Sequence, residues 1–294
     1  MSSLSIPKSI GIQLFSLPKR LNNDLPGTID MLAQMGYTEV ELFGPYPFST
    51  DMALAEWEAI TPYLGFSGSG FFGRTVREMH GILSQNGMSV AALHTDLDTL
   101  QYRMDKLGEA AQTLGTNYVV LPAIPEQHRQ TMDDYRRMAD TFNQIGESAR
   151  QAGVRFAYHN HGYGLHEQDG QTPLQLLLDH TDPELVFLEL DIYWTTAGGA
   201  DPITLLDSYS DRYRLIHLKD MAEPVRFSGD GSVSTEWMSL FPYMTTLGNG
   251  VLNVSDIVAK AQAAGVEHFI VEQDLVADPD VSLRKSSDFL RPIG

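Results

Sequence analysis

The stretch FAYHNHGYGLHE, residues 156–167, places several chemically capable side chains directly after a short apolar run. They are His159, Asn160, His161 and Glu167, with His166 between the last two. Imidazole nitrogens and carboxylates bind metal ions and carry protons near neutral pH, so a metal site and an acid–base site are both compatible with this composition. A polar loop that is simply rich in histidine is the third interpretation.

Polar residues also follow other apolar runs along the chain. They are Gln13, Glu41, His94, Asp191, His217 with Lys219, and Glu272. Removing an unpaired charge from water costs several kcal/mol, so the recurrence of such residues behind buried strands indicates a shared purpose. A divalent cation would supply that purpose by neutralising converging carboxylates. The chain contains no cysteine, and its Asp, His and Glu donors favour Mn²⁺, with Mg²⁺, Co²⁺ or Zn²⁺ as alternatives.

Asp191, His217 and Glu272 hold equivalent places, because each stands immediately behind an apolar strand: FLEL, RLI and FIV. Each also has a purely structural interpretation. Asp191 would cap a helix, His217 would be a hydrogen-bonded core histidine, and Glu272 would pair with Lys219. Three separate structural roles at three equivalent positions require a coincidence, and a single metal site does not.

A unit of helix, glycine and strand recurs and would position these residues. Helix-like runs end at five glycines, each followed at once by an apolar run: Gly36, Gly87, Gly115, Gly153 and Gly265. Glycine just past a helix end adopts the left-handed conformation that caps the helix. With three further runs, the sequence predicts eight strands, at about residues 10–15, 38–43, 89–94, 118–122, 155–159, 185–191, 213–218 and 268–273.

These apolar runs are nearly continuous, as is typical of parallel strands buried on both faces. Eight such units in 294 residues predict an α/β fold, a single (β/α)8 TIM barrel over residues 1–294, with a doubly wound sheet as the alternative. The carboxyl ends of barrel strands meet at one mouth, where the polar residues would converge. Residues 44–73 and 221–250 fall outside the repeat and are expected to be long loops, after the second and seventh strands, that cover this mouth.

The net charge of the chain and the distribution of its basic residues indicate which binding partners to expect. The formal net charge is −18 and the basic residues are scattered, so a nucleic-acid partner is not expected. The N-terminus lacks the pattern of a signal peptide, and no apolar stretch approaches the ~20 residues that span a bilayer. A cytoplasmic protein without a membrane partner is the expectation.

Four motifs in this order, YHNHGYG, ELDIYWTTAGGADP, RLIHLKD and FIVEQD, resemble the xylose isomerase-like TIM barrels known as sugar phosphate isomerases/epimerases. The resemblance extends from GIQLFSL to the last strand, and it includes ketose 3-epimerases, hydroxypyruvate isomerases and inosose dehydratases. It implies one divalent metal held by Glu, Asp, His and Glu from strands five to eight. The last three ligands correspond to Asp191, His217 and Glu272.

The sequence departs from the family pattern at two places. The fifth strand ends in His159, Asn160 and His161 instead of a glutamate, and Gly164 stands where the HNH branch commonly has one. The resemblance to inosose dehydratases implies Glu167 as the fourth ligand, with His161 or a water as rivals. Trp194 replaces the histidine with which ketose epimerases hold substrate, and a flat aromatic side chain suits stacking against a sugar or cyclitol ring.

The resemblance therefore implies a metal-dependent isomerase or epimerase of a sugar-like carbonyl compound that acts through an enediolate. Glu272 on one side and Glu167 or His161 on the other would exchange the proton, and Lys219 would polarise the carbonyl or act as an acid. The expected substrate contacts are Gln13, Glu41, His94, His159, Asn160 and Trp194. A lyase or dehydratase acting through the same intermediate is the close alternative, and a non-catalytic sugar-binding barrel is the alternative from another class. Barrels of this size commonly form homodimers.

Overall fold

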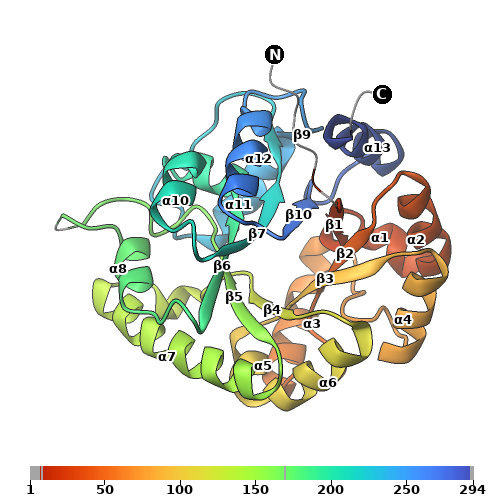
Figure 1. Cartoon of the computed structure of the whole chain (residues 1–294), viewed down its shortest axis with the longest axis horizontal. Coiled ribbons are helices and arrows are strands. Elements are labelled where there is room, and N and C mark those ends of the chain that lie inside the picture. The colour runs from red at the N-terminus through yellow and green to blue at the C-terminus, as the bar shows by residue number, and fades with distance from the viewer. Residues whose placement is uncertain (1–6, 8, 169, 292–294) are drawn as a thin grey trace.

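Eight parallel strands close into a barrel in the computed structural model, which describes residues 7, 9–168 and 170–291 (Figure 1). Around the barrel the strand order is β1-β10-β7-β6-β5-β4-β3-β2. The strands are β1 (Gly11–Gln13), β2 (Glu39–Phe43), β3 (Ser89–His94), β4 (Tyr118–Leu121), β5 (Arg155–His159), β6 (Val186–Asp191), β7 (Tyr213–Leu218) and β10 (His268–Val271). Every predicted strand is present, with each end within two residues of the expected position, and the predicted TIM barrel is confirmed.

Helices surround the barrel (Figure 1). They are α1 (Pro18–Asn23), α2 (Leu25–Gln34), α3 (Asp51–Leu64), α4 (Val76–Gln85), α5 (Leu97–Tyr102), α6 (Met104–Leu114), α7 (Met132–Gln151), α8 (Pro173–Asp179), α9 (Ile192–Ala197), α10 (Pro202–Ser208), α11 (Ser234–Leu240), α12 (Val254–Ala263) and α13 (Pro279–Leu290), with 3-10 turns η1 (Leu14–Ser16), η2 (Glu126–His128) and η3 (Phe241–Tyr243). The five predicted capping glycines all have positive φ, between 66° and 87°. Within the described residues, no helix combines the length and apolar character that crossing a membrane requires.

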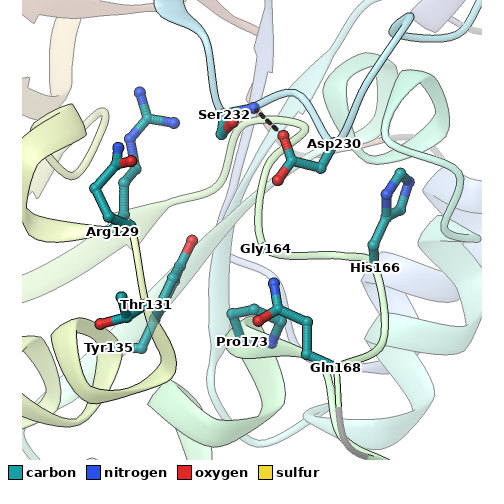
Figure 2. Close-up of a pocket in the computed structure, with 10 residues that line it drawn as sticks. Arg129, Thr131, Tyr135, Gly164, His166, Gln168, Pro173, Asp230 and Ser232 are labelled. Carbon is teal, nitrogen blue, oxygen red and sulfur yellow. Dashed lines mark hydrogen bonds between the residues drawn. The ribbon is translucent and has the colours of Figure 1, made fainter.

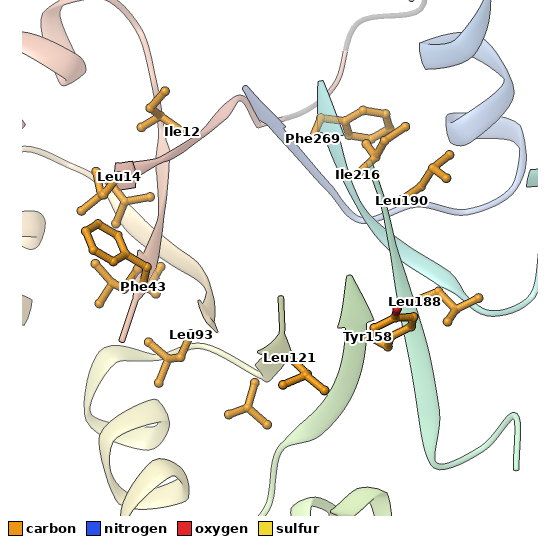
Figure 3. Packing of buried hydrophobic residues seen from close by; sticks show 14 of the residues in the cluster. Ile12, Leu14, Phe43, Leu93, Leu121, Tyr158, Leu188, Leu190, Ile216 and Phe269 are labelled. Atoms are coloured by element: carbon orange, nitrogen blue, oxygen red, sulfur yellow. The ribbon is translucent and has the colours of Figure 1, made fainter. Parts of the chain in front are cut away.

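The two faces of each strand pack in different ways. Outward-facing residues such as Ile12, Leu93, Leu188 and Ile216 belong to the large core beneath the helices (Figure 3). Inward-facing residues form a separate apolar cluster, which contains Ala92, Tyr118, Val120, Ala157, Leu215 and Ile270. Successive strand side chains point to opposite faces, so the inward row that contains Ala157, Leu215 and Ile270 continues to His159, His217 and Glu272. The apolar cluster is therefore the floor on which the polar strand ends stand.

The two segments predicted to lie outside the repeat do follow β2 and β7. The first contains α3 and the turns that lead into α4. The second contains α11 and a small antiparallel pair, β8 (Asp220–Met221) with β9 (Met244–Thr245), which was not predicted. Asp220 anchors this segment, because its carboxylate accepts hydrogen bonds from the backbone N–H groups of Gly248, Gly250 and Leu252 at 2.9, 3.0 and 3.2 Å.

Candidate active site

Most of the polar residues predicted at strand ends meet inside the mouth of the barrel. Nine of them have exposed fractions between 0 and 6%, namely Gln13, Glu41, His94, His159, Asn160, Asp191, His217, Lys219 and Glu272. Burial at this depth means that their charges must be satisfied by one another or by a ligand.

Asp191, His217 and Glu272 form one compact group, in which one ligand atom from each residue lies within 4.8 Å of the others. The Nδ1 atom of His217 lies 2.7 Å from Glu272 Oε2 and 3.9 Å from Asp191 Oδ2. Asp191 Oδ1 accepts the Trp194 N–H at 2.8 Å and so caps α9. Asp191 Oδ2 is buried and has no hydrogen-bond partner among the described residues. The structural interpretation of Asp191 as a cap therefore holds for one oxygen, while the other has the Lys219 ammonium at 3.1 Å as an ion-pair partner.

A second group lies directly beside the first and includes a residue that the sequence analysis missed. Glu189, fully buried in β6, has Oε2 at 2.7 Å from His94 Nε2 and at 3.0 Å from His159 Nδ1. Its Oε1 lies 3.3 Å from His217 Nε2. The signal that could have found it is its position two residues before Asp191, which puts both side chains on the same inner face of one strand.

The histidines of the two groups are each held by a buried glutamate. His217 presents Nε2 to Glu41 Oε2 at 2.5 Å, and Gln13 Nε2 donates to the same oxygen at 2.8 Å. His159 presents Nδ1 to Glu189, which leaves its Nε2 at 3.6 Å from Asp191 Oδ2. In metal sites a carboxylate commonly fixes the tautomer and orientation of a ligating histidine in this way.

Lys219 is buried among three carboxylates. Its Nζ lies 2.6 Å from Glu272 Oε2, 2.9 Å from Asp274 Oδ2 and 3.1 Å from Asp191 Oδ2. Burial alone would lower the pKa of Lys219, but Asp191, Asp274 and Glu272 hold it well above its usual value. The side chain is therefore an ammonium ion, and the predicted pairing with Glu272 is present.

The buried charges also set the protonation of their neighbours. Burial opposes the charged form of Glu272, yet the Lys219 ammonium and His217 hold its pKa well below the usual value. Burial likewise disfavours protonation of His94, but Glu41 and Glu189 raise its pKa to about 9. Burial and then the nearby His217 lower the pKa of His159. The lowered pKa favours the neutral imidazole, which is the form that binds a metal ion.

An aromatic stack covers one side of the site. The ring of His161 lies between Trp194 and Trp237, with centroid distances of 5.6 and 4.3 Å, and Phe227 stacks on Trp194 at 5.8 Å. Burial, followed by the neighbouring His159 and Lys219, holds the pKa of His161 well below its usual value. Trp194 is 1% exposed, so in this arrangement the indole that was predicted to stack against a sugar is covered by protein rings.

Two further predicted residues have clear positions. Asn160 donates to Thr195 Oγ1 at 2.9 Å and accepts the backbone N–H of Asp191 at 3.3 Å, so it positions the aspartate. Glu167 is exposed on the loop after β5 and belongs to neither buried group. The structure therefore does not bring it together with Asp191, His217 and Glu272, because the loop turns outward after Gly164.

The buried donors fit a divalent cation. They combine carboxylate oxygens and imidazole nitrogens, the donor types that Mn²⁺ and Zn²⁺ accept. Glu41 Oε1, Glu189 Oε1 and Asp191 Oδ2 are all buried and accept no hydrogen bond from the described residues, although His217 Nε2 lies 3.3 Å from the second oxygen and Lys219 Nζ lies 3.1 Å from the third. Such unsatisfied oxygens are costly, and a cation among them would remove that cost.

Comparison with known proteins agrees with this fold. The sequence profile described as Xylose isomerase-like TIM barrel matches residues 29–293, and the chain belongs to that family. An inosose dehydratase from Geobacillus thermodenitrificans (strain NG80-2) is 24% identical over 293 residues, which cover 88% of this chain and 95% of that protein. Several other inosose dehydratases match over about half of their length or less.

Two solved structures show the same fold. A sugar phosphate isomerase/epimerase from Parabacteroides distasonis ATCC 8503 has a TM-score of 0.75 and 23% identity, and the match covers 98% of this chain and 95% of that one. The IOLI protein with a bound zinc atom has a TM-score of 0.64 and 14% identity, and the match covers 96% of this chain and 95% of that one. The chain is thus a member of a sugar-processing barrel family in which both isomerases and dehydratases are named.

Proposed function

We propose that this protein is a metal-dependent enzyme that removes a proton from the carbon beside a carbonyl group in a sugar-like or cyclitol substrate. The observation that carries the proposal is the buried Asp191–His217–Glu272 group, with Lys219 in contact with both of its carboxylates. Ammonium, carboxylate and metal-ligating atoms at the mouth of a barrel are the parts that such proton abstraction requires.

The proposed ligands are Asp191 Oδ2, His217 Nδ1 and Glu272 Oε2, with His159 Nε2 as the ligand from the fifth strand. His159 replaces Glu167 in this role because its Nε2 already faces Asp191, and Glu189 holds the other ring nitrogen. When bound, a divalent cation would supply a Lewis acid for the carbonyl oxygen of the substrate. Mn²⁺ remains our first choice, with Zn²⁺, Mg²⁺ and Co²⁺ as alternatives.

The remaining chemistry belongs to side chains of this chain. Glu272 is the proposed base, because Lys219 and His217 keep it ionised. His161 is the proposed second proton carrier, since burial keeps its imidazole neutral and its Nδ1 has no hydrogen-bond partner among the described residues. Lys219 is the proposed acid that donates a hydrogen bond to the developing oxyanion. The aromatic stack of Trp194 and Trp237 would exclude water from this step.

The fate of the carbanion defines the reaction. Return of the proton to the same or the neighbouring carbon gives an epimer or an isomer, which is our main proposal. Loss of a hydroxyl from the adjacent carbon gives a dehydration, and this is the second candidate because a relative matched over most of both chains is named inosose dehydratase.

The test combines metal analysis with solvent exchange. The purified protein is assayed for bound metal and then incubated in D₂O with ketoses, inososes and 3-keto-glycosides, and deuterium incorporation is followed by NMR. We expect exchange at one carbon beside the carbonyl, lost after chelation and lost in Glu272→Gln, with the product showing isomerisation or dehydration. A metal-loaded protein that exchanges none of these substrates would refute catalysis and favour a sugar-binding barrel.

A further inference from the structure

A second polar feature lies at the rim of the mouth, beside the buried metal-ligand group. The loops that follow β4, β5 and β7 enclose a cavity of about 110 Å³ (Figure 2). The loop after β4 contributes Arg129, and α7, which follows that loop, contributes Tyr135. The second loop contributes His166, and the third contributes Asp230 and Ser232. Three separate loops thus contribute polar groups to one enclosed space.

Arg129 is the unusual member of this lining. The residue is only 4% exposed, and its Nη2 donates to Ser234 Oγ at 2.7 Å. Its Nε and Nη1 atoms are buried, and within residues 7, 9–168 and 170–291 neither has a hydrogen-bond partner. Arginine stays charged in proteins, so a buried guanidinium with two nitrogens unsatisfied carries a large desolvation cost unless an anion completes it.

Aromatic rings hold the guanidinium in place and connect it to the metal-ligand group. Its central carbon lies 3.9 Å from the centroid of the Tyr163 ring and 5.1 Å from that of Trp237. Trp237 in turn stacks on His161 at 4.3 Å, and His161 packs edge-on against His159 at 5.1 Å. The cavity and the buried ligands are therefore separated by one aromatic layer, which contains Trp237 and His161.

The charges around the cavity indicate which anion would fit. Asp230, held by the Ser232 N–H at 3.0 Å, contributes a carboxylate to the lining opposite the single guanidinium (Figure 2). The one guanidinium and the one carboxylate leave no excess positive charge in the lining, and a phosphate dianion loses much more hydration on burial than a singly charged group does. The pairing of one arginine with polar neighbours therefore favours a carboxylate over a phosphate.

We propose that this cavity binds a carboxylate group of the substrate, and that the substrate class is an acidic sugar or cyclitol, such as a uronic acid derivative. This inference rests on the proposed function for the metal-ligand group and narrows its substrate. Arg129 would bind the carboxylate, and the Trp237 side chain would have to move aside for the carbonyl end of the same molecule to reach the buried ligands.

The test uses three probes that share one ring and differ only at C6: D-glucuronate, D-glucose and D-glucose 6-phosphate. Their binding to the intact metal-loaded protein is measured by calorimetry and by quenching of tryptophan fluorescence, since Trp237 contacts Arg129. We expect glucuronate to bind at least about tenfold more tightly than glucose, the scale of one charge-assisted contact. Arg129→Met should remove this preference and Arg129→Lys should keep part of it, while metal content stays unchanged.

Matched controls separate the outcomes. Ser234→Ala removes only the existing partner of Nη2 and should retain the preference for glucuronate. Tighter binding of glucose 6-phosphate than of glucuronate would overturn the carboxylate assignment. Equal binding of all three probes, no saturation by glucuronate, or an unchanged preference in Arg129→Met would overturn the anion site itself. A protein that keeps the Arg129-dependent preference but fails the D₂O exchange assay would refute only the proposed function.

Discussion

Individual residues in this site work as pairs of a histidine and a glutamate. Glu41 holds His217 and Glu189 holds His159, and both glutamates are fully buried. Each of these carboxylates has one oxygen without a hydrogen-bond partner among the described residues. Burying these carboxylates costs folding free energy, and each of them fixes the direction in which its imidazole presents the other ring nitrogen. The pairing therefore supports His159 and His217 as metal ligands.

Glu189→Gln tests this pairing directly. The substitution keeps the shape of the side chain but removes the charge that holds His159, so metal affinity should fall by about 10- to 100-fold. Metal titration of the stripped protein measures the change. Glu167→Gln is the matched control, because Glu167 is exposed on the loop and should leave the affinity unaltered. If instead Glu167→Gln weakened metal binding and Glu189→Gln did not, the fifth-strand ligand would be Glu167 after all.

Lys219→Met tests the buried ammonium. Asp191, Glu272 and Asp274 would lose their common partner, so the metal-free protein should become less stable by about 3 kcal/mol or more. Added Mn²⁺ should restore part of this loss, because a cation would again neutralise Asp191 and Glu272. With metal bound, kcat should fall by roughly 10²-fold if Lys219 acts as the acid. Chemical denaturation and steady-state rates provide the two measurements.

The control for this substitution is Lys260→Met in α12. Lys260 is partly exposed and pairs with Asp207 at the surface, so its loss should change stability by less than about 0.5 kcal/mol. Wild-type stability in Lys219→Met would mean that the three carboxylates are satisfied without the ammonium. Wild-type turnover would leave His161 as the acid.

At the scale of helices and strands, much of the architecture could be predicted from sequence. The capping glycines and the continuous apolar runs are local signals, and they locate all eight barrel strands. The strand-end positions of Asp191, His217 and Glu272 follow from the same pattern. Glu189 was missed because a single glutamate inside an apolar run forms no pattern by itself. Its position two residues before Asp191 is the signal, since residues two apart in a strand face the same side.

Loops were less predictable because their direction depends on tertiary contacts. Glu167 has the spacing of a ligand, but the chain turns outward before reaching it, and Gly164 sits against the Tyr135 hydroxyl at the start of that turn. Arg129 stands in a loop with no periodic pattern, and only the packing of Tyr163 and Trp237 shows that it is buried. Residues whose environment comes from three different loops carry no local signature.

Two helical glycines give a matched test of how closely the outer helices pack. A Cβ on Gly146 in α7 would lie 2.6 Å from the Leu185 carbonyl oxygen, whereas a Cβ on Gly81 in α4 would have nothing within 4 Å. Gly146→Ala should therefore destabilise the protein by about 1–3 kcal/mol through overpacking. Gly81→Ala should stabilise it by roughly 0.5–1 kcal/mol through better helix propensity. Thermal denaturation of both variants checks the pair, and equal effects of the two would show that α7 can move away.

The whole barrel has two polar ends separated by the apolar floor. The carboxyl ends of the strands hold the candidate active site, and the amino ends hold a different group. There Arg155 Nη1 donates to the Tyr118 hydroxyl at 3.0 Å, and that hydroxyl donates to Glu267 Oε2 at the same distance. His268 Nδ1 lies 3.0 Å from Glu39 Oε2. In barrel enzymes chemistry belongs to the first end, so the second end is expected to affect stability alone.

His268 allows this division to be tested through pH. Burial would lower the pKa of His268, but the hydrogen bond and charge of Glu39 raise it above the usual 6.5. A raised pKa in the folded state means that this pair stabilises the fold fully below about pH 6.5, and that the contribution is lost as the pH rises through the folded value. Wild-type protein should thus lose about 1 kcal/mol more stability than His268→Gln between pH 6 and pH 9.

The measurement is urea denaturation across this range with a chelator present, so that metal occupancy does not change with pH. His128→Gln, at an exposed histidine of η2, should follow the wild-type curve. Because His268 lies at the amino ends of the strands, His268→Gln should retain wild-type metal content and wild-type deuterium exchange when metal is restored. A parallel loss of exchange would show that the two ends of the barrel are coupled across the apolar floor, and an unchanged pH dependence would show that the pair with Glu39 contributes nothing to folding.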